Sequence, residues 1–141
     1  MALQTTPSPK RTVEEIAGEG GIVSLEIDGT YGNDRYLVKI NGVPIHLTGK
    51  SFKYLTKLAW FRRMRPAGWA YKDDIEAGFN QPRYLYRMKG EIADVVRDLG
   101  PLTENNRLGY YRLLAEPEAI TINVENLKSH PDFELRSLVT S

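Results

Sequence analysis

The sequence predicts an α+β fold in which an antiparallel sheet is followed by three helices and a hairpin. Three observations lead to this prediction. Alternating apolar residues and turn signals fill residues 21–47. Apolar residues recur at helical spacing in residues 49–64 and 82–99, and a polar tip interrupts the apolar residues of 102–114. A chain of 141 residues suits one domain.

Three strands are expected at the start of this domain. Residues 21–28 and 35–40 are rich in Ile, Val and Leu, and a loop containing glycine and asparagine separates them. Asn41-Gly42 is a two-residue hairpin signal, because both positions tolerate a positive φ. Residues 43–47 therefore form the third strand, and Pro44 favours an edge position.

Three helices are expected next. Thr48 can cap a helix over residues 49–64, which Pro66-Ala67-Gly68 ends. A short helix follows over residues 72–79, with two aspartates in its first turn. The third helix spans about residues 82–99, since Pro82 suits a first helical position and Gly100-Pro101 closes the segment.

A hairpin over residues 102–114 completes the domain, and its tip is a wing at about residues 104–109. Three helices closed by a hairpin are the winged helix-turn-helix arrangement, which we predict for residues 21–114. Residues 1–20 are polar, contain prolines and glycines, and are expected to form a flexible arm. Residues 115–141 form an acidic extension with a strand, a helix or both, broken at Pro131.

Positive charge is concentrated in one third of the chain. The net charge is only +1, but residues 50–90 contain ten Lys or Arg against three carboxylates, a net charge of +7. Residues 1–49, 91–113 and 114–141 carry −2, −1 and −3. Such asymmetry is typical of proteins that bind nucleic acid or another polyanion.

The third predicted helix has a basic and aromatic outward face. Arg83, Tyr86, Arg87 and Arg97 fall opposite its apolar sector. Cations fill its first turns and carboxylates its later turns, as expected for a helix that enters a DNA major groove by its N-terminal end. Gly90 costs roughly 1 kcal/mol against alanine within a helix, yet it lets a partner approach the backbone closely. The alternative is an ordinary amphipathic helix with a solvated charged face.

Three segments in this order resemble the winged-helix effector domain of OmpR/PhoB-type response regulators, over roughly residues 22–114. Residues 41–48 are similar to the strand pair that leads into this family's L-T-x-x-E-F helix start, with Ser51 in place of the glutamate. Residues 84–89 are similar to its h-I-x-r-L-R recognition helix, and residues 109–113 to its G-Y-R-L ending. The sequence departs at Gly90-Glu91, where the family continues with lysines.

The resemblance implies a regulator of transcription that binds double-stranded DNA. The family places a receiver domain ahead of this one, and residues 1–20 are too few for it, so we expect an excised effector domain or a stand-alone winged helix. The expected DNA-contacting residues are Arg83, Tyr84, Tyr86, Arg87, Lys89 and Arg97 of the third helix, Thr48, Lys50, Lys53, Arg62, Arg63 and Arg65 of the first, and Asn105, Asn106 and Arg107 of the wing. Neutralising about six phosphates gives a log–log salt slope of roughly −5.

A second hypothesis is a winged-helix module for protein interaction or self-association. It rests on the departure at Gly90-Glu91 and on the acidic tail from residue 116 to 138. This tail has three possible roles: docking a partner, covering the fold, or folding back over the basic surface as an autoinhibitor.

Other function classes have little support. The chain has no cysteine, and His46 and His130 lack zinc-ligand spacing. Asp73 and Asp74 are adjacent and diverge on a helix, so they do not form a paired acid site. We therefore expect no enzyme activity, no cofactor and no metal. No apolar run reaches the roughly 18 residues of a membrane span, and the first residues lack a secretory signal, so the expected location is the cytoplasm.

Overall fold

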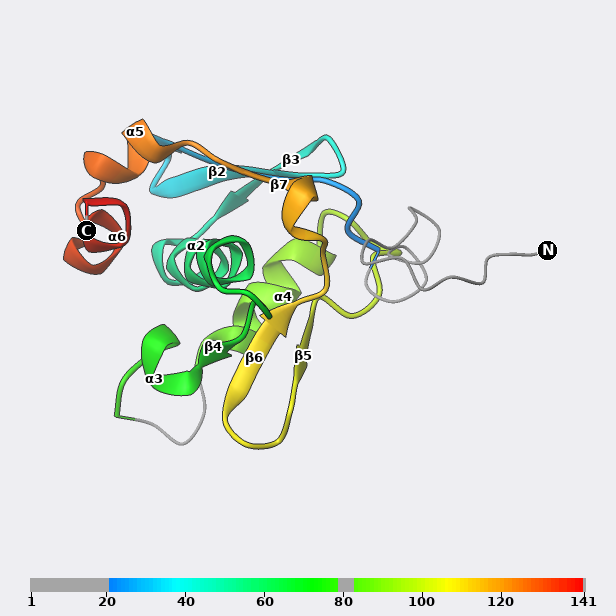
Figure 1. The fold of residues 1–141 in the computed structure, drawn as a ribbon. Helices are drawn as coiled ribbons and strands as arrows, with labels where there is room; N and C mark the ends of the chain where they lie inside the picture. The colour runs from blue at the N-terminus through cyan, green and yellow to red at the C-terminus, as the bar shows by residue number, and fades with distance from the viewer. Residues whose placement is uncertain (1–20, 79–82, 141) are drawn as a thin grey trace.

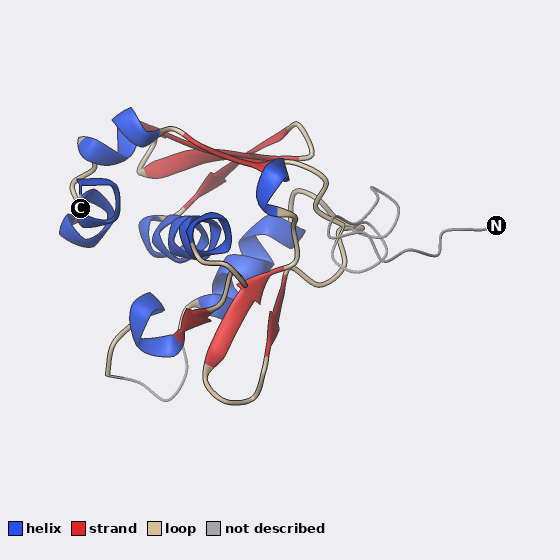
Figure 2. Cartoon of the chain, in the orientation of Figure 1, coloured by secondary structure: helices blue, strands red, loops and turns tan. Residues whose placement is uncertain are grey.

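The computed structural model describes residues 21–78 and 83–140, and it has an α+β fold (Figure 1). The structure has three layers (Figure 2). A four-stranded sheet forms the upper layer, helices α2 and α4 the middle one, and a small three-stranded sheet the lower one. Among the described residues no helix is long and apolar enough to cross a membrane.

The upper sheet contains the three predicted N-terminal strands and one from the tail. These strands are β1 (Leu25–Gly32), β2 (Arg35–Ile40), β3 (Val43–Leu47) and β7 (Ile120–Ile122). Their order is β3-β2-β1-β7; the first three are antiparallel, and β7 is parallel to β1. Leu25 pairs with Ile40 and Ile27 with Val38, so one face of the sheet is fully buried.

The predicted Asn41-Gly42 hairpin is confirmed, with φ values of 54° and 82°. The Asn41 side chain also accepts hydrogen bonds from the Val23 and Ser24 amides at 2.8 and 3.1 Å. The β1–β2 connection differs from the prediction, because β1 continues to Gly32 past a register shift and the turn is confined to Asn33-Asp34.

Helix α2 (Gly49–Met64) matches the predicted range and lies at the centre of the molecule. Its predicted stripe is buried, and so are residues on its other sides, including Tyr54, Lys57 and Arg62. The reason is that the upper sheet, α4, the small sheet and the tail surround it. A helix buried on all sides shows little amphipathic pattern, which is why the sequence placed several of these side chains in solvent.

The third predicted helix is wrong in extent. Helix α4 covers Leu85–Ala93 rather than residues 82–99, and the predicted start at 81–82 lies outside the described residues. The amides of Val95 and Val96 both donate to the Ile92 carbonyl, at 3.0 and 2.9 Å, which tightens the last turn. Aspartates and adjacent β-branched valines in residues 94–98 favour helix less than the preceding residues do. Arg97 is therefore not on this helix.

The remaining short elements form the lower layer. Strand β4 (Ala70–Tyr71) leads into α3 (Lys72–Ile75), which is shorter than the predicted 72–79. Strands β5 (Thr103–Asn105) and β6 (Tyr110–Leu113) pair antiparallel, and the sheet order is β4-β6-β5. This pair does not end the chain, because a short 3-10 helix η1 (Pro117–Ala119), β7 and two further helices follow it.

The tail is packed against the rest of the fold. Helices α5 (Val124–Lys128) and α6 (Phe133–Thr140) flank Pro131, and they bury Leu127 and Leu135 in the same cluster as the sheet and α2. Lys53 of α2 lies 3.0 Å from Asp132, and Lys57 pairs with Glu134. Of the three roles considered for the tail, covering the fold is the one that these contacts support.

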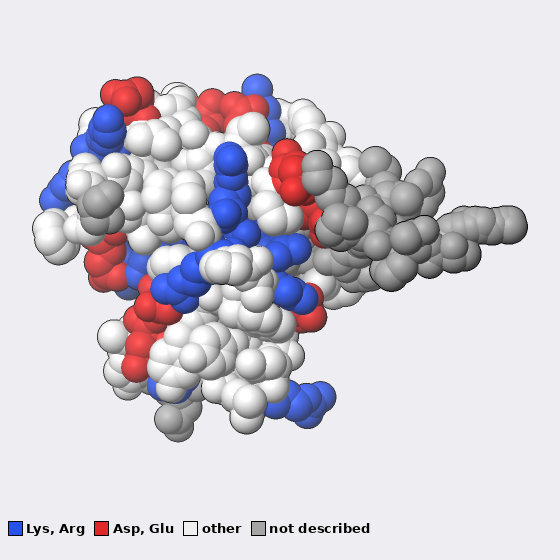
Figure 3. Space-filling model, viewed as in Figure 1, with Lys and Arg blue, Asp and Glu red and all other residues white. Residues whose placement is uncertain are grey.

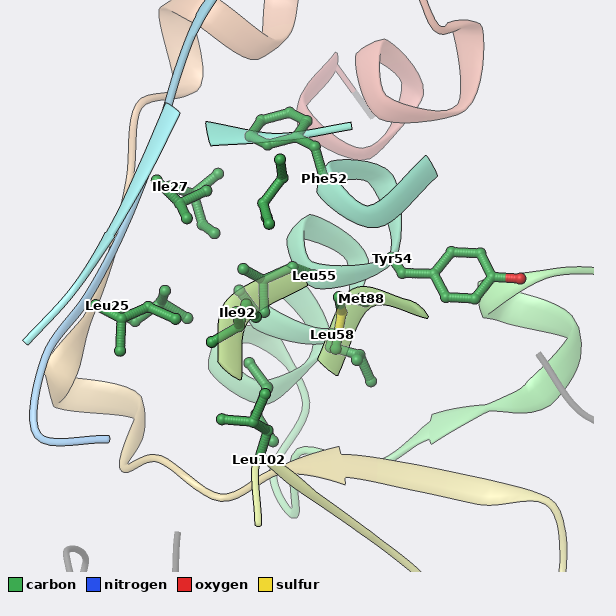
Figure 4. Packing of buried hydrophobic residues seen from close by; sticks show 14 of the residues in the cluster. Leu25, Ile27, Phe52, Tyr54, Leu55, Leu58, Met88, Ile92 and Leu102 are labelled. Atoms are coloured by element: carbon green, nitrogen blue, oxygen red, sulfur yellow. The ribbon is translucent and has the colours of Figure 1, made fainter. Parts of the chain in front are cut away.

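The core lies between the upper sheet and the two long helices (Figure 4). Side chains from all three layers meet there, namely Leu25, Ile27, Phe52, Leu55, Leu58, Met88, Ile92 and Leu102. Tyr54 extends away from them, and its hydroxyl donates to Glu76. Helix α4 is therefore fixed by its buried face, which leaves its opposite face open.

We expect Leu135→Ala to destabilise the whole domain by about 2–5 kcal/mol, because it opens a cavity in the shared core. Urea unfolding followed by circular dichroism should show one transition at a lower midpoint. Phe133→Ala is the matched control, because Phe133 lies on the same helix and is 71% exposed. A separate early transition in Leu135→Ala, with the main midpoint unchanged, would show that the tail folds independently.

Candidate functional site

Helix α4 presents an unpartnered face to solvent. Leu85, Met88 and Ile92 point into the core, whereas Tyr86 is 88% exposed and Arg87 lies beside it on the outside. A Cβ added at Gly90 would meet nothing within 4 Å, so internal packing does not require a glycine there. The exposed face is therefore both cationic and aromatic, as the sequence predicted.

A groove of about 460 Å³ separates α4 from β5. It is lined by Arg83, Leu85, Tyr86, Lys89, Thr103, Asn105 and Tyr111. The groove brings together residues that the sequence had assigned to two separate parts of the site, the third helix and the hairpin. Thr103 and Tyr111 were not among the predicted site residues, because only the β5–β6 pairing places them beside α4.

Arg83 is held by a carboxylate. Its Nη2 lies 3.0 Å from Glu76 Oε2, and its backbone amide donates to Glu76 Oε1 at 3.1 Å. The Arg83 guanidinium is the main cause that lowers the pKa of Glu76 to about 2, and the Tyr54 hydroxyl also lowers it. Arg83 is therefore oriented at the entrance of the groove rather than swinging freely.

Arg87 is oriented by Glu91, which also contacts Thr48, Ser51 and, at 3.8 Å, Arg35. Arg87 Nε donates to Glu91 Oε2 at 3.2 Å, and its terminal amino groups have no hydrogen bond to any described residue. Glu91 also accepts from the Thr48 amide at 3.0 Å and the Ser51 hydroxyl at 2.8 Å. Burial raises the pKa of Glu91, but these hydrogen bonds outweigh it, so the pKa lies below its usual value.

Lys89 is half-buried in the groove wall. Burial lowers its pKa, and no carboxylate of the described residues pairs with it. A desolvated ammonium without a counterion is a favourable site for an anion, because the anion restores the electrostatic interaction lost on burial. Arg97 is exposed and borders the adjoining hollow of about 160 Å³, which Lys89 also lines.

The β5–β6 loop holds an arginine at its tip. Arg107 adopts a positive φ of 64°, and its amide donates to Asn105 Oδ1 at 3.0 Å. Asn106 Oδ1 accepts from the Leu108 and Tyr110 amides at 2.8 and 3.2 Å. The side-chain oxygens of both asparagines thus build the turn, and Arg107 and Leu108 are exposed at its tip together with the two asparagines.

Most of the predicted contacts on α2 are engaged within the protein. Lys53 pairs with Asp132 and Glu134, and the Thr48 hydroxyl donates to Glu91 at 2.7 Å. Arg62 is buried, and its Nε donates to the Ala115 carbonyl at 2.7 Å. These groups reach no outside partner without breaking the fold, so the predicted interface on α2 is smaller than expected.

The other predicted contact residues near α2 have different surroundings from one another. Arg63 donates to the Ile120 carbonyl at 3.0 Å, and Arg65 lies 3.0 Å from Asp74. Lys50 is exposed, 5.5 Å from the centre of the Tyr84 ring, next to the start of α4. Tyr84 packs edge-on against Tyr54 of α2, so its ring is engaged within the protein.

Because many basic side chains pair with carboxylates, positive and negative charges are intermixed on the surface. Figure 3 shows Lys and Arg crossing the middle of one face among Asp and Glu, with further basic side chains beside the β5–β6 loop. Within residues 21–78 and 83–140, no group of three His, Asp or Glu has the geometry to hold a metal ion. The sequence analysis did not predict that Glu76 and Glu91 orient the two arginines. The local signal for this was the spacing of four residues between Arg87 and Glu91.

The Glu76–Arg83 pair predicts an acid-dependent loss of stability. The pKa of Glu76 is about 2 against an ordinary 4.5, so its contribution is complete above pH 4.5 and is lost as the pH falls toward 2. We expect Glu76→Gln to be less stable at pH 7 by roughly 0.5–1 kcal/mol, since the partner arginine is half exposed. Urea midpoints should converge between the two proteins as the pH falls through this window. Parallel curves, as expected for the exposed control Glu125→Gln, would contradict the assignment.

No protein-family model, curated protein or solved structure matches this chain. The resemblance to response-regulator effector domains therefore stays a prediction from three short sequence segments.

Proposed function

We propose that this chain is a winged-helix domain that binds double-stranded DNA and regulates transcription. Helix α4 enters the major groove, and the β5–β6 loop is the wing that reaches the adjacent minor groove. The order of α2, α3, α4 and the β5–β6 pair supports this arrangement. The small sheet supports it too, because β4 fixes the hairpin beside the helices.

The groove between α4 and β5 is the observation that carries the proposal. One wall supplies Arg83, Tyr86 and Lys89, and the other supplies Asn105. A DNA strand that runs along the groove brings its phosphates to the Lys89 ammonium, which pairs with no carboxylate of the described residues. The α4 face beside it then meets base edges, and the wing tip carries Arg107 toward the next groove of the duplex.

Arg87 on α4 and Arg83 just before it have different proposed roles. The terminal amino groups of Arg87 bond no described residue and its Nε is fixed by Glu91, which suits bidentate recognition of guanine. Arg83 is committed to Glu76, so it contacts phosphate as part of an ion pair. The sequence had predicted the same contacts for both arginines, with base edges or with the phosphates that flank them.

The internal pairing of α2 lowers the expected salt dependence. Lys53, Arg62, Arg63 and Arg65 are engaged with protein groups, which leaves about four cations for phosphates. The log–log slope of affinity against salt is then roughly −4 rather than −5.

Protein interaction through the tail is the second candidate function. Phe133 is 71% exposed beside a groove of about 340 Å³ that Trp60, Phe61 and Leu138 also line. An exposed apolar patch of this kind favours a protein partner. It lies on α6 and α2, away from the α4 face, so the two functions are separable by mutation.

The first test is binding to random-sequence duplex DNA, followed by fluorescence anisotropy from about 50 to 300 mM salt. We expect Arg87→Ala with Lys89→Ala to weaken binding roughly 10- to 100-fold, because it removes a base contact and a phosphate contact. Arg63→Ala with Lys128→Ala removes the same charge elsewhere and is expected to weaken binding by less than about threefold. Equal losses in the two double variants would mean non-specific attraction. Absence of binding in low salt would refute the proposal and favour the Phe133 surface.

The second test uses the open position at Gly90. Gly90→Ala should raise stability by up to about 1 kcal/mol, since nothing in the fold meets the added methyl. It should also weaken DNA binding about tenfold, because the methyl occupies the closest approach of the helix to the duplex. Gly49→Ala, on α2, also meets nothing within 4 Å and is the matched control. Unchanged affinity in Gly90→Ala would place α4 further from the DNA than proposed.

A further inference from the structure

A second hollow lies on the α5 side of the upper sheet and belongs to neither proposed surface. Its volume is about 490 Å³, within the range of small-molecule sites. It is lined by Gly29, Thr30, Tyr31, Tyr36, Asn126, Ser129, His130 and Pro131. We propose that this hollow binds a small organic cation, of the quaternary ammonium or amine class.

Aromatic rings form the main wall of this hollow. The centre of the Tyr36 ring lies 5.0 Å from that of Tyr31 and 4.6 Å from that of His130. Phe52 stacks on Tyr36 at 5.0 Å, which fixes its orientation from the core. Electron-rich ring faces attract cations, and the attraction is stronger where the site excludes water.

The charges around the hollow have the sign that a cation requires. None of the lining residues is Lys or Arg. The Asp28 carboxylate accepts from the Thr30 amide at 2.9 Å, and the Asp34 carboxylate accepts from the Tyr31 hydroxyl at 2.6 Å, so both flank the same wall. Outside the lining, Arg136 Nη1 donates to the His130 and Pro131 carbonyls at 2.7 and 2.8 Å, and Lys53 is neutralised by Asp132 and Glu134. The Asp28 and Asp34 carboxylates each bond to a residue that lines the hollow, so the charge along this wall favours a cation.

His130 keeps the wall neutral. It is 7% exposed, its Nδ1 accepts from the Asp132 amide at 2.9 Å, and its Nε2 has no partner among the described residues. Burial lowers the pKa of His130 below its ordinary 6.5, so the ring is uncharged at neutral pH and does not repel a cation.

The hollow is held by contacts between distant parts of the chain. Asn126 Nδ2 donates to the Asp28 carbonyl at 2.7 Å, which joins α5 to β1. The Tyr36 hydroxyl has no hydrogen bond to any described residue, so it is available to a hydroxyl or amine on the ligand. The pattern of a neutral aromatic wall, flanking carboxylates and one free hydroxyl matches a hydroxylated quaternary ammonium compound.

Choline is the probe that tests this proposal, and 3,3-dimethyl-1-butanol is its neutral control of the same shape. Binding to the full chain is followed by NMR shifts of the backbone amides of residues 29–31 and 126–130. We expect millimolar binding of choline, at least fivefold weaker binding of the neutral alcohol, and two- to fivefold weaker choline binding in Tyr31→Leu. Tyr31→Phe keeps the ring and is expected to bind as the unmodified chain does.

Each other outcome overturns the proposal. Equal affinity for choline and the alcohol would identify an apolar site without cation preference. Shifts that persist in Tyr31→Leu, or that lie outside the named segments, would place the cation elsewhere. No shift at tens of millimolar choline would mean that no cation site exists there. None of these results depends on DNA binding, so the proposal stands or fails apart from the α4 interface.

Discussion

The carboxylate of Glu91 fixes the geometry on which the α4 surface depends. It accepts hydrogen bonds from the Thr48 amide, the Thr48 hydroxyl and the Ser51 hydroxyl, so it ties α4 to the start of α2. It also lies 3.8 Å from Arg35 Nη1, and it orients Arg87. One carboxylate thereby sets both the position of the helix and the direction of the Arg87 side chain.

This interaction also explains two departures of the sequence from the response-regulator pattern. Ser51 stands where the family has a glutamate at the start of the first helix, and Glu91 stands where the family continues with lysines. In the structure these two residues contact each other at 2.8 Å, and the contact joins the start of α2 to α4. The resemblance itself stays a prediction.

The sequence predicted what local chemistry determines. Asn41-Gly42 defined a turn, and the range 49–64 matched α2, because an apolar repeat and a breaker act within a few residues. Thr48 occupies the N-cap position, but its hydroxyl donates to Glu91 and makes no capping hydrogen bond. It could not predict the partners of Arg62 or Lys53, since these lie more than fifty residues away. Positive charge counted along the chain consequently overstated the free charge on the surface. The groove beside α4 could not be predicted for the same reason, because its second wall forms only when β5 pairs with β6.

The parallel pairing of β7 with β1 has a consequence for the synthesis of the protein. Leu25 pairs with Ile120, so the sheet on which α2 packs is completed only by a strand that emerges late from the ribosome. Contacts between residues so distant in sequence require an entropically unfavourable loop closure before their interaction energy is gained, which slows folding. The apolar face of β1–β3 must therefore avoid contacts with other proteins until β7 and the helices after it have been synthesised. Helix α4 and its basic face are made earlier, but the core that positions them is finished last.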